Sequence, residues 1–275
     1  MEWKNLYRGF LMGISDLVPG VSGGTIAFIL GIYERFLESI SGFFSKEWKK
    51  HVPFLLPLVL GIGSALLIFS RVFDFLLTNY REPTYYFFIG LVLGIIPFFA
   101  KQANVKTMFR WQHFTVALFM AIAWGSMRLV QVNDLAITSL NFTRGIGLFL
   151  AGWLASMAML LPGISGSLIL MSVGVYESAI NALSTFNLPI IIVIGLGVAI
   201  GFIVSSKAIT YILKTYPQMT YALILGLILG SVFVMYPGLP ESGTPLVMSI
   251  IALITGLIVA NILNEVGEMS RKVVK

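Results

Sequence analysis

Two short polar turns are the parts of this chain best suited to chemistry, and they resemble each other. Residues 17–24 read LVPGVSGG, and residues 160–167 read LLPGISGS. Each turn combines Pro and Gly, which break helices, with a Ser that can cap the start of the next helix. A helix that begins there presents unpaired N–H groups and the positive end of its dipole, which together suit an anion such as phosphate. We therefore predict a phosphate-binding site built from Ser22, Gly23, Gly24, Thr25, Ser165, Gly166 and Ser167.

The similarity between the two halves of the chain extends beyond these turns. At an offset of 143 residues, 9 of the 18 positions from 17 to 34 are identical. At an offset of 136 residues, 7 of the 15 positions from 80 to 94 are identical. We therefore predict two copies of one unit, at about 1–140 and 141–275, which form a single integral membrane domain. A turn that occurs twice is also less easily explained as a packing kink, which is the alternative to an anion site.

The composition indicates a protein that crosses a membrane many times. Hydrophobic residues make up 57% of the 275 residues, charged residues only 11%, and the mean hydropathy is +0.92. The absence of cysteine excludes disulfides and thiolate metal sites, two histidines are too few for a histidine-rich cluster, and we expect no cofactor. We assign the net charge of +6 to cytoplasmic loops rather than to nucleic-acid binding. The first residues lack the apolar region of a signal peptide, so none is expected.

Six apolar segments are long enough to predict transmembrane helices, near 53–70, 84–100, 113–130, 188–206, 219–236 and 245–263. The first of them is expected to continue as helix toward Tyr80. The arms around the first turn, 6–18 and 24–33, hold 13 and 10 residues, short of the ~20 that a spanning helix needs. They form either a hairpin that enters and leaves on one side or one broken helix that crosses.

The distribution of Lys and Arg favours the hairpin. With the N-terminus in the cytoplasm, hairpins place 14 of these residues inside and 4 outside, whereas crossing arms place 11 inside and 7 outside. Three crossings per unit then turn the second copy upside down, as in the inverted repeats of secondary transporters. We therefore predict an all-α polytopic membrane protein with an inverted-topology repeat. Each unit is a re-entrant helical hairpin plus three transmembrane helices, and both termini are cytoplasmic.

Several charged residues have two interpretations each. Asp16 lies in an apolar arm, where a buried acid is costly, and this favours a functional role such as proton coupling. Glu34 and Glu177 end the second arms, either as proton-coupling carboxylates or as interfacial residues beside a Tyr at headgroup level. Four basic residues are candidate headgroup cations or, alternatively, snorkelling charges at helix ends: Arg8, Arg71, Arg144 and Lys207.

Residues 16–25, DLVPGVSGGT, together with residues 161–167, LPGISGS, resemble the bacterial and archaeal polyprenyl-phosphate transporter family. The resemblance covers nearly the whole chain. It implies a lipid carrier translocase, or flippase, in the bacterial cytoplasmic membrane. Its substrate would be undecaprenyl phosphate, the C55 lipid carrier, which is returned across the membrane for reuse in cell-envelope synthesis.

Two other functions remain as alternatives. Undecaprenyl-diphosphate phosphatases also have inverted repeats with re-entrant hairpins, and their motif resembles Pro-Gly-x-Ser-Arg-Ser. In this chain Gly23 and Gly166 occupy the Arg position, so no guanidinium is present there to stabilise a phosphoryl transition state. We therefore expect no enzyme activity and no catalytic residues. The second alternative, a small-anion secondary transporter, needs a closed polar path rather than a groove open to lipid.

Overall fold

The computed structural model of this chain describes residues 1–17, 22–105, 109–129, 137, 140–240 and 242–274. These residues form helices and contain no strand. The helices of the first half are α1 (Lys4–Asp16), α2 (Gly23–Ile29), α3 (Tyr33–Phe43), α4 (Trp48–Asn79), α5 (Arg81–Gln102), α7 (Trp111–Gly125) and the 3₁₀ helix η1 (Ser126–Leu129). Those of the second half are α8 (Phe142–Leu160), α9 (Gly166–Ser172), α10 (Tyr176–Ser184), α11 (Leu188–Thr215), α12 (Pro217–Met235) and α13 (Thr244–Val274).

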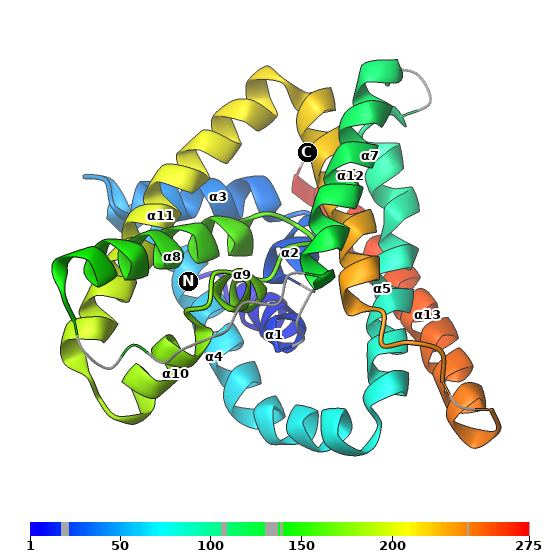
Figure 1. Ribbon diagram of the computed structural model, residues 1–275. Helices are drawn as coiled ribbons and strands as arrows, with labels where there is room; N and C mark the ends of the chain where they lie inside the picture. Colours follow the sequence, from blue (N-terminus) through cyan, green and yellow to red (C-terminus); the bar gives the residue numbers. More distant parts are fainter. Residues whose placement is uncertain (18–21, 106–108, 130–136, 138–139, 241, 275) are drawn as a thin grey trace.

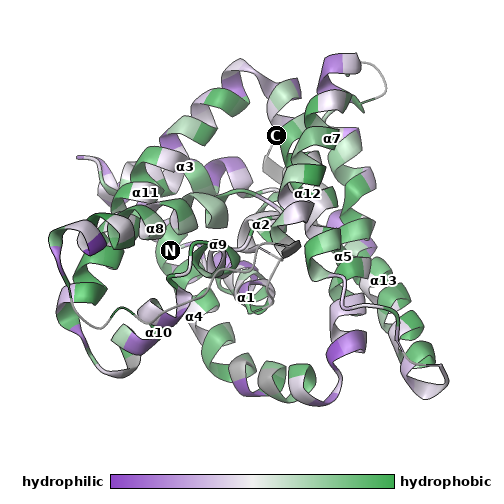
Figure 2. Cartoon of the chain, viewed as in Figure 1, coloured by the Kyte–Doolittle hydropathy of each residue, from purple (hydrophilic) through white to green (hydrophobic). Residues whose placement is uncertain are grey.

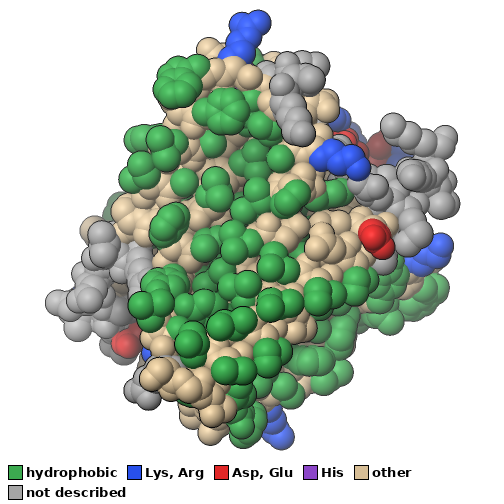
Figure 3. Space-filling view, turned by 90° about the vertical axis from the view of Figure 1, so that its right-hand side faces the viewer, with side chains coloured by type: hydrophobic (Ala, Val, Ile, Leu, Met, Phe, Trp, Pro, Cys, Tyr) green, Lys and Arg blue, Asp and Glu red, His purple; other side chains and the backbone are tan. Residues whose placement is uncertain are grey.

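Six of the described helices are long and apolar enough to cross a membrane: α4, α5, α8, α11, α12 and α13. Most residues of these helices are hydrophobic, and hydrophilic residues are found mainly near the helix ends (Figure 2). The face of the molecule on which α5 and α13 lie is broadly hydrophobic, and its charged side chains are mainly at the margins (Figure 3). The prediction of an all-helical, multi-pass membrane protein is confirmed.

Two helices differ from the predicted spans. The segment expected at 113–130 is a helix only as far as Gly125, because the chain then tightens into η1, and its 15 residues are short for a span. In the second half, α8 has 19 residues and is itself long enough to cross. Its equivalent in the first half, α1, is shorter. Composition explains this difference, because α1 begins with polar and charged residues, whereas α8 is apolar over most of its length. The predicted continuation of the first span toward Tyr80 is confirmed, since α4 runs to Asn79.

The long helices pack in matching pairs. The most extensive contacts join α1 to α4, α8 to α11, α5 to α13, and α7 to α12. The sequence offsets relate the first pair to the second and the third pair to the fourth. At the third and fourth pairs, a Cβ added at Gly90 would overlap the carbonyl oxygen of Leu253, and one added at Gly226 would overlap that of Ala117. Both contacts are equivalent at the offset of 136, so the last helix of each half packs on the preceding helix of the other half.

The short helix α2 lies in the middle of the molecule, beside α1, α3 and α8 (Figure 1). All seven of its residues are buried. Phe28 anchors it, because its ring stacks on that of Phe99 of α5 with centroids 3.9 Å apart. Burial of such aromatic side chains is among the stronger contributions to a core. Because α2 follows the first turn directly, its packing on α5 fixes the position of that turn.

Candidate functional site

The first turn is closed by its own side chains. Ser22 is the N-cap of α2, with extended backbone, and its Oγ accepts a hydrogen bond from the N–H of Gly24 at 3.1 Å. The N–H of Gly23 donates to Oδ1 of Asp16 at 2.6 Å. The carboxylate thus lies where an external anion would bind at the start of this helix. The Pro-Gly part of this turn, in residues 18–21, lies outside the described residues.

The two turns, far apart in the sequence, contact each other. The Ser22 hydroxyl donates to the carbonyl of Met159 at 3.1 Å, and the buried Tyr33 hydroxyl donates to that of Leu160 at 3.0 Å. In the other direction, the N–H of Gly163 donates to Oγ1 of Thr25 at 2.9 Å. Three hydrogen bonds therefore join the beginning of α2 and the first residue of α3 to the end of α8 and the second turn. The predicted residues Ser22 and Thr25 thereby lie against the end of α8 and the second turn.

Gly163 is the residue of the second turn that only glycine suits. Its φ of +88° lies in the left-handed region, which other residues adopt only with strain. A Cβ there would also lie 2.8 Å from the backbone nitrogen of Ile228 in α12. The Pro-Gly pair thus bends the chain at a close contact with a long helix, as its sequence predicts.

The hydroxyls of Ser165 and Ser167 lie 2.8 Å apart and hydrogen-bond to each other. Ser165 is the N-cap of α9 and is only 5% exposed, yet its side chain makes no capping bond. In a pair of hydroxyls one proton serves the mutual bond, so the other remains to be donated elsewhere. Gly166 between them has no room for a side chain, because an added Cβ would lie 2.6 Å from Cγ of Met159.

The two turns are therefore unequal. In the first, the N–H groups of Gly23 and Gly24 already have partners in Asp16 and Ser22. In the second, the residue equivalent to Asp16 is Met159, which supplies no carboxylate. A repeated motif has become one turn that carries its own anion and one that does not.

A cavity of about 550 Å³ leads to the first turn. Asp16, Gly23 and Gly24 line it together with Met159 and Leu160 at the end of α8. They lie at the end near Ile62, because Gly13, one turn before Asp16 on α1, packs against Ile62. Its walls are apolar and come from α1, α3, α4 and α11. The volume falls within the range of about 300–1,000 Å³ that is usual for small-molecule sites.

Most of the predicted charged residues do not reach the turns. Arg71 on α4 and Lys207 on α11 are exposed, as is Arg144 near the start of α8. Glu34 and Glu177 are exposed at the starts of α3 and α10. Exposure agrees with the interfacial interpretation of these two acids. Of the three predicted proton-coupling acids, Asp16 is the one that lies at a turn.

The sequence did not predict the burial of two polar residues, Tyr33 next to Glu34 and Asn5 near the N-terminus. Tyr33 is 2% exposed and hydrogen-bonds to the second turn, so the expectation of a Tyr at headgroup level is wrong for this residue. Its identity with Tyr176 at the repeat offset was the available signal, but a repeat does not reveal which partner a hydroxyl finds. Asn5 is fully buried, and no sequence pattern indicated this.

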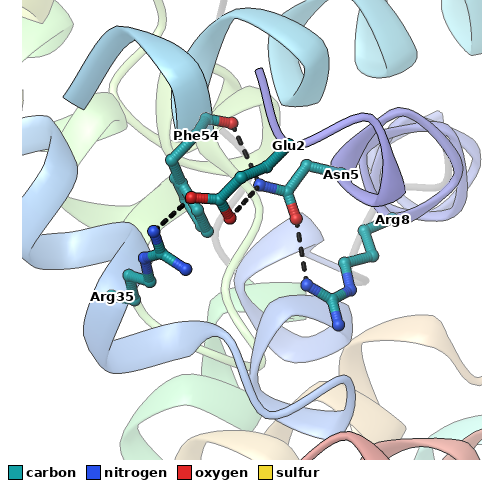
Figure 4. A network of polar contacts seen from close by, with 5 residues as sticks. All are labelled: Glu2, Asn5, Arg8, Arg35 and Phe54. Atoms are coloured by element: carbon teal, nitrogen blue, oxygen red, sulfur yellow. Dashed lines mark hydrogen bonds and ion pairs between the residues drawn. The ribbon is translucent and has the colours of Figure 1, made fainter. Parts of the chain in front are cut away.

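Arg8 belongs to a network around Asn5, shown in Figure 4. Its Nη1 donates to Oδ1 of Asn5 at 3.0 Å, while Nδ2 of Asn5 donates to the carbonyl of Phe54 at 3.2 Å. Glu2 accepts from Asn5 and pairs with Arg35. The network ties the N-terminus to α3 and α4, so Arg8 has a structural role whether or not it meets a ligand.

The comparison with known families decides the assignment. A family model described as undecaprenyl phosphate translocase-like matches residues 12–244, a range that includes both turns. The chain belongs to this undecaprenyl phosphate translocase-like family. The resemblance inferred from the two motifs is thereby confirmed.

Two curated relatives of this translocase-like family member carry the name polyprenyl-phosphate transporter. The protein of Staphylococcus aureus is 41% identical over 274 residues, covering 96% of this chain and 97% of the relative. The protein of Vibrio cholerae is 34% identical over 251 residues, covering 86% of this chain and 79% of the relative. No solved structure matches the chain. The family and its relatives are described as transporters, not as enzymes.

Proposed function

We propose that this chain moves polyprenyl phosphate, in particular undecaprenyl phosphate, across the cytoplasmic membrane so that the carrier is reused in envelope synthesis. The observation that carries the proposal is the contact between the two turns, where Ser22 meets Met159 and Thr25 meets Gly163. Because the two turns touch, a headgroup can pass from one to the other without entering the hydrocarbon core with its polar atoms unpaired. The names of the relatives agree with this substrate.

The inverted repeat is part of the proposal. The matched pairs α1–α4 with α8–α11, and α5–α13 with α12–α7, are those that two copies of one unit would form. The 14-to-4 distribution of basic residues supports hairpins that do not cross. On this topology the whole chain is one membrane domain in which equivalent turns face opposite sides.

The headgroup first meets the second turn. Ser165 and Ser167 share one mutual hydrogen bond and retain a proton to donate. Hydrogen bonds to a charged partner contribute about 1.5–3 kcal/mol each, so a few suffice to hold a phosphate without a fixed cation. Arg71, Arg144 and Lys207 are exposed and serve, with Arg8, to attract the lipid phosphate at the surfaces.

The first turn accepts the headgroup only after Asp16 releases Gly23. Until then Ser22, Gly23, Gly24 and Thr25 are hydrogen-bonded to other groups of the protein. Protonation of Asp16 would weaken its hold on the Gly23 N–H, because a charge-assisted hydrogen bond is roughly twice as strong as a neutral one. Asp16 therefore couples the hand-over to a proton. Glu34 and Glu177, exposed at helix starts, are placed to exchange that proton with water.

A proton would also offset an electrical cost. Moving one negative charge toward the cytoplasm costs about 2.3 kcal/mol per 100 mV of membrane potential. One proton carried with each singly charged headgroup removes this cost. A lone acid at the meeting point of the turns is the residue best placed to carry it.

Reconstitution separates the proposal from its two rivals. Purified protein in phosphatidylcholine vesicles should move polyprenyl phosphate between leaflets without releasing inorganic phosphate. A phosphatase would release phosphate from polyprenyl diphosphate, and a small-anion transporter would carry inorganic phosphate into the lumen without moving lipid. Either of those results, without lipid movement, would contradict the proposal.

A further inference from the structure

The cavity that ends at the first turn follows one stripe of α4. Residues one helical turn apart line it: Trp48, Val52, Leu55, Leu56, Val59 and Ile62. Ile62 lies 14 residues after Trp48, so the stripe is roughly 21 Å long at about 1.5 Å per residue. Half of the hydrocarbon core of a bilayer is about 15 Å thick. The cavity therefore extends along a transmembrane helix for about the depth of one leaflet.

The wall of the cavity opposite α4 is aromatic, and the α4 wall is partly open to the surface. Phe36 and Phe43 come from α3, and Phe202 comes from α11. On the α4 side, Val59 is 58% exposed although it lines the cavity. An apolar chain therefore has access from the surrounding lipid beside Leu56 and Val59, which are 41% and 58% exposed.

The two ends of the cavity differ in charge. Its inner end carries the carboxylate of Asp16, which repels an anion. Beside Trp48 at its outer end, the corner between α3 and α4 carries Lys46, Lys49 and Lys50, all exposed. Lys50 pairs with Glu47 at 2.9 Å and lowers the pKa of that carboxyl, while the Lys49 ammonium lies 5.9 Å from the Trp48 ring centroid. A phosphate therefore suits the outer end, and an apolar chain suits the rest.

We propose that this cavity is a binding site for the polyprenyl chain of a polyprenyl monophosphate in the cytoplasmic leaflet, with the phosphate held at the lysines of the α3–α4 corner. The proposal rests on the proposed function and on its topology, which places this corner in the cytoplasm. It adds a second position for the lipid, after its headgroup has left the turns. A single chain fits a narrow groove of one leaflet's depth, and its apolar end points toward Asp16.

The chain-binding part is tested by narrowing the groove. Val59→Trp places a large side chain in it, and Leu60→Trp, on the next residue of α4, places the same side chain on a surface that is 48% exposed and does not line the cavity. The measurement is the retention of labelled polyprenyl phosphate and of uncharged polyprenol by purified protein in phosphatidylcholine nanodiscs. Val59→Trp should weaken both about tenfold, through lost apolar contacts, while Leu60→Trp should match the unsubstituted protein. Equal retention by the two variants would overturn the site, and Leu56→Trp provides a second narrowing variant if Val59→Trp does not fold.

The headgroup part is tested by removing charge. Lys49→Gln and Lys50→Gln should each weaken the binding of polyprenyl phosphate roughly fivefold and leave the binding of polyprenol unchanged. The reason is that each basic residue near a membrane surface adds a similar increment to the binding free energy of an anionic lipid. Equal losses for polyprenol would contradict a phosphate contact. Diacyl phosphatidic acid is the competing occupant. If it displaces polyprenyl phosphate at equal concentration, the groove is a general phospholipid site and the proposal fails.

The failure of this site and the failure of the proposed function give different results. If the unsubstituted protein moves polyprenyl phosphate between leaflets but Val59→Trp and Leu60→Trp retain it equally, only the groove assignment is wrong. If the unsubstituted protein neither moves nor retains polyprenyl phosphate, the proposed function is wrong as well.

Discussion

The backbone N–H of Gly23 donates a 2.6 Å hydrogen bond to the carboxylate of Asp16, seven residues earlier in the chain. The second turn has the same Pro-Gly-x-Ser-Gly pattern, but Met159 stands at the position of Asp16. A single substitution between the repeats thus gives one turn an internal anion. Two sites that would otherwise be equal become different, as a directional transfer requires.

Replacing Asp16 by Asn should separate its two roles. The Asn Oδ1 still accepts from the Gly23 N–H, so lipid binding is retained, but the side chain no longer binds a proton. We expect Asp16→Asn to transport polyprenyl phosphate in vesicles without the response to a pH gradient that the unsubstituted protein has. Asp16→Ala also removes the acceptor and should be less stable to heat by about 1–3 kcal/mol. A normal pH response in Asp16→Asn would mean that Asp16 is structural.

The serines of the two turns should respond differently to substitution. Ser22 caps α2 and bonds to Met159, so Ser22→Ala should lower the free energy of unfolding by about 1 kcal/mol. Ser165 makes no capping bond and hydrogen-bonds to the half-buried Ser167, so Ser165→Ala should cost less thermal stability than Ser22→Ala while weakening polyprenyl phosphate binding by about 1–2 kcal/mol. Melting curves and lipid retention on the same samples measure both. A stability loss in Ser165→Ala as large as that in Ser22→Ala would remove the basis for assigning Ser165 to the ligand.

Much of this architecture follows from sequence, because membrane helices must satisfy their backbone internally and therefore appear as long apolar segments. The end of α4 at Asn79, the repeat and the motif that carries the family resemblance are of this kind. The tertiary contacts of single side chains cannot be predicted in this way. The hydrogen bond from Tyr33 to Leu160 and the burial of Asn5 depend on helices that meet only in the fold. The length of α8 was missed because the repeat suggested a short arm, whereas local composition allowed a longer helix.

The topology can be tested with single cysteines, since the chain has none of its own. Phe186→Cys and Ser242→Cys should react with an impermeant thiol reagent added outside intact cells, because both residues are exposed and predicted to be external. Ser45→Cys, between α3 and α4, should react only after the membrane is opened, as should cysteines within 101–112. Protection of position 186 in intact cells would exclude the inverted repeat as drawn.

The most direct test of the account compares two glycine substitutions in the same translocation assay. Gly166→Val forces a side chain against Met159 and against the carbonyl of Ala155, 2.9 Å from the added Cβ, and blocks the second turn. Gly195→Val adds the same group on α11, where an added Cβ meets nothing within 4 Å. In vesicles loaded with polyprenyl phosphate, we expect Gly195→Val to move the lipid between leaflets as the unsubstituted protein does and Gly166→Val to move none. Equal translocation by both variants, in protein of equal thermal stability, would show that the headgroup does not pass the second turn.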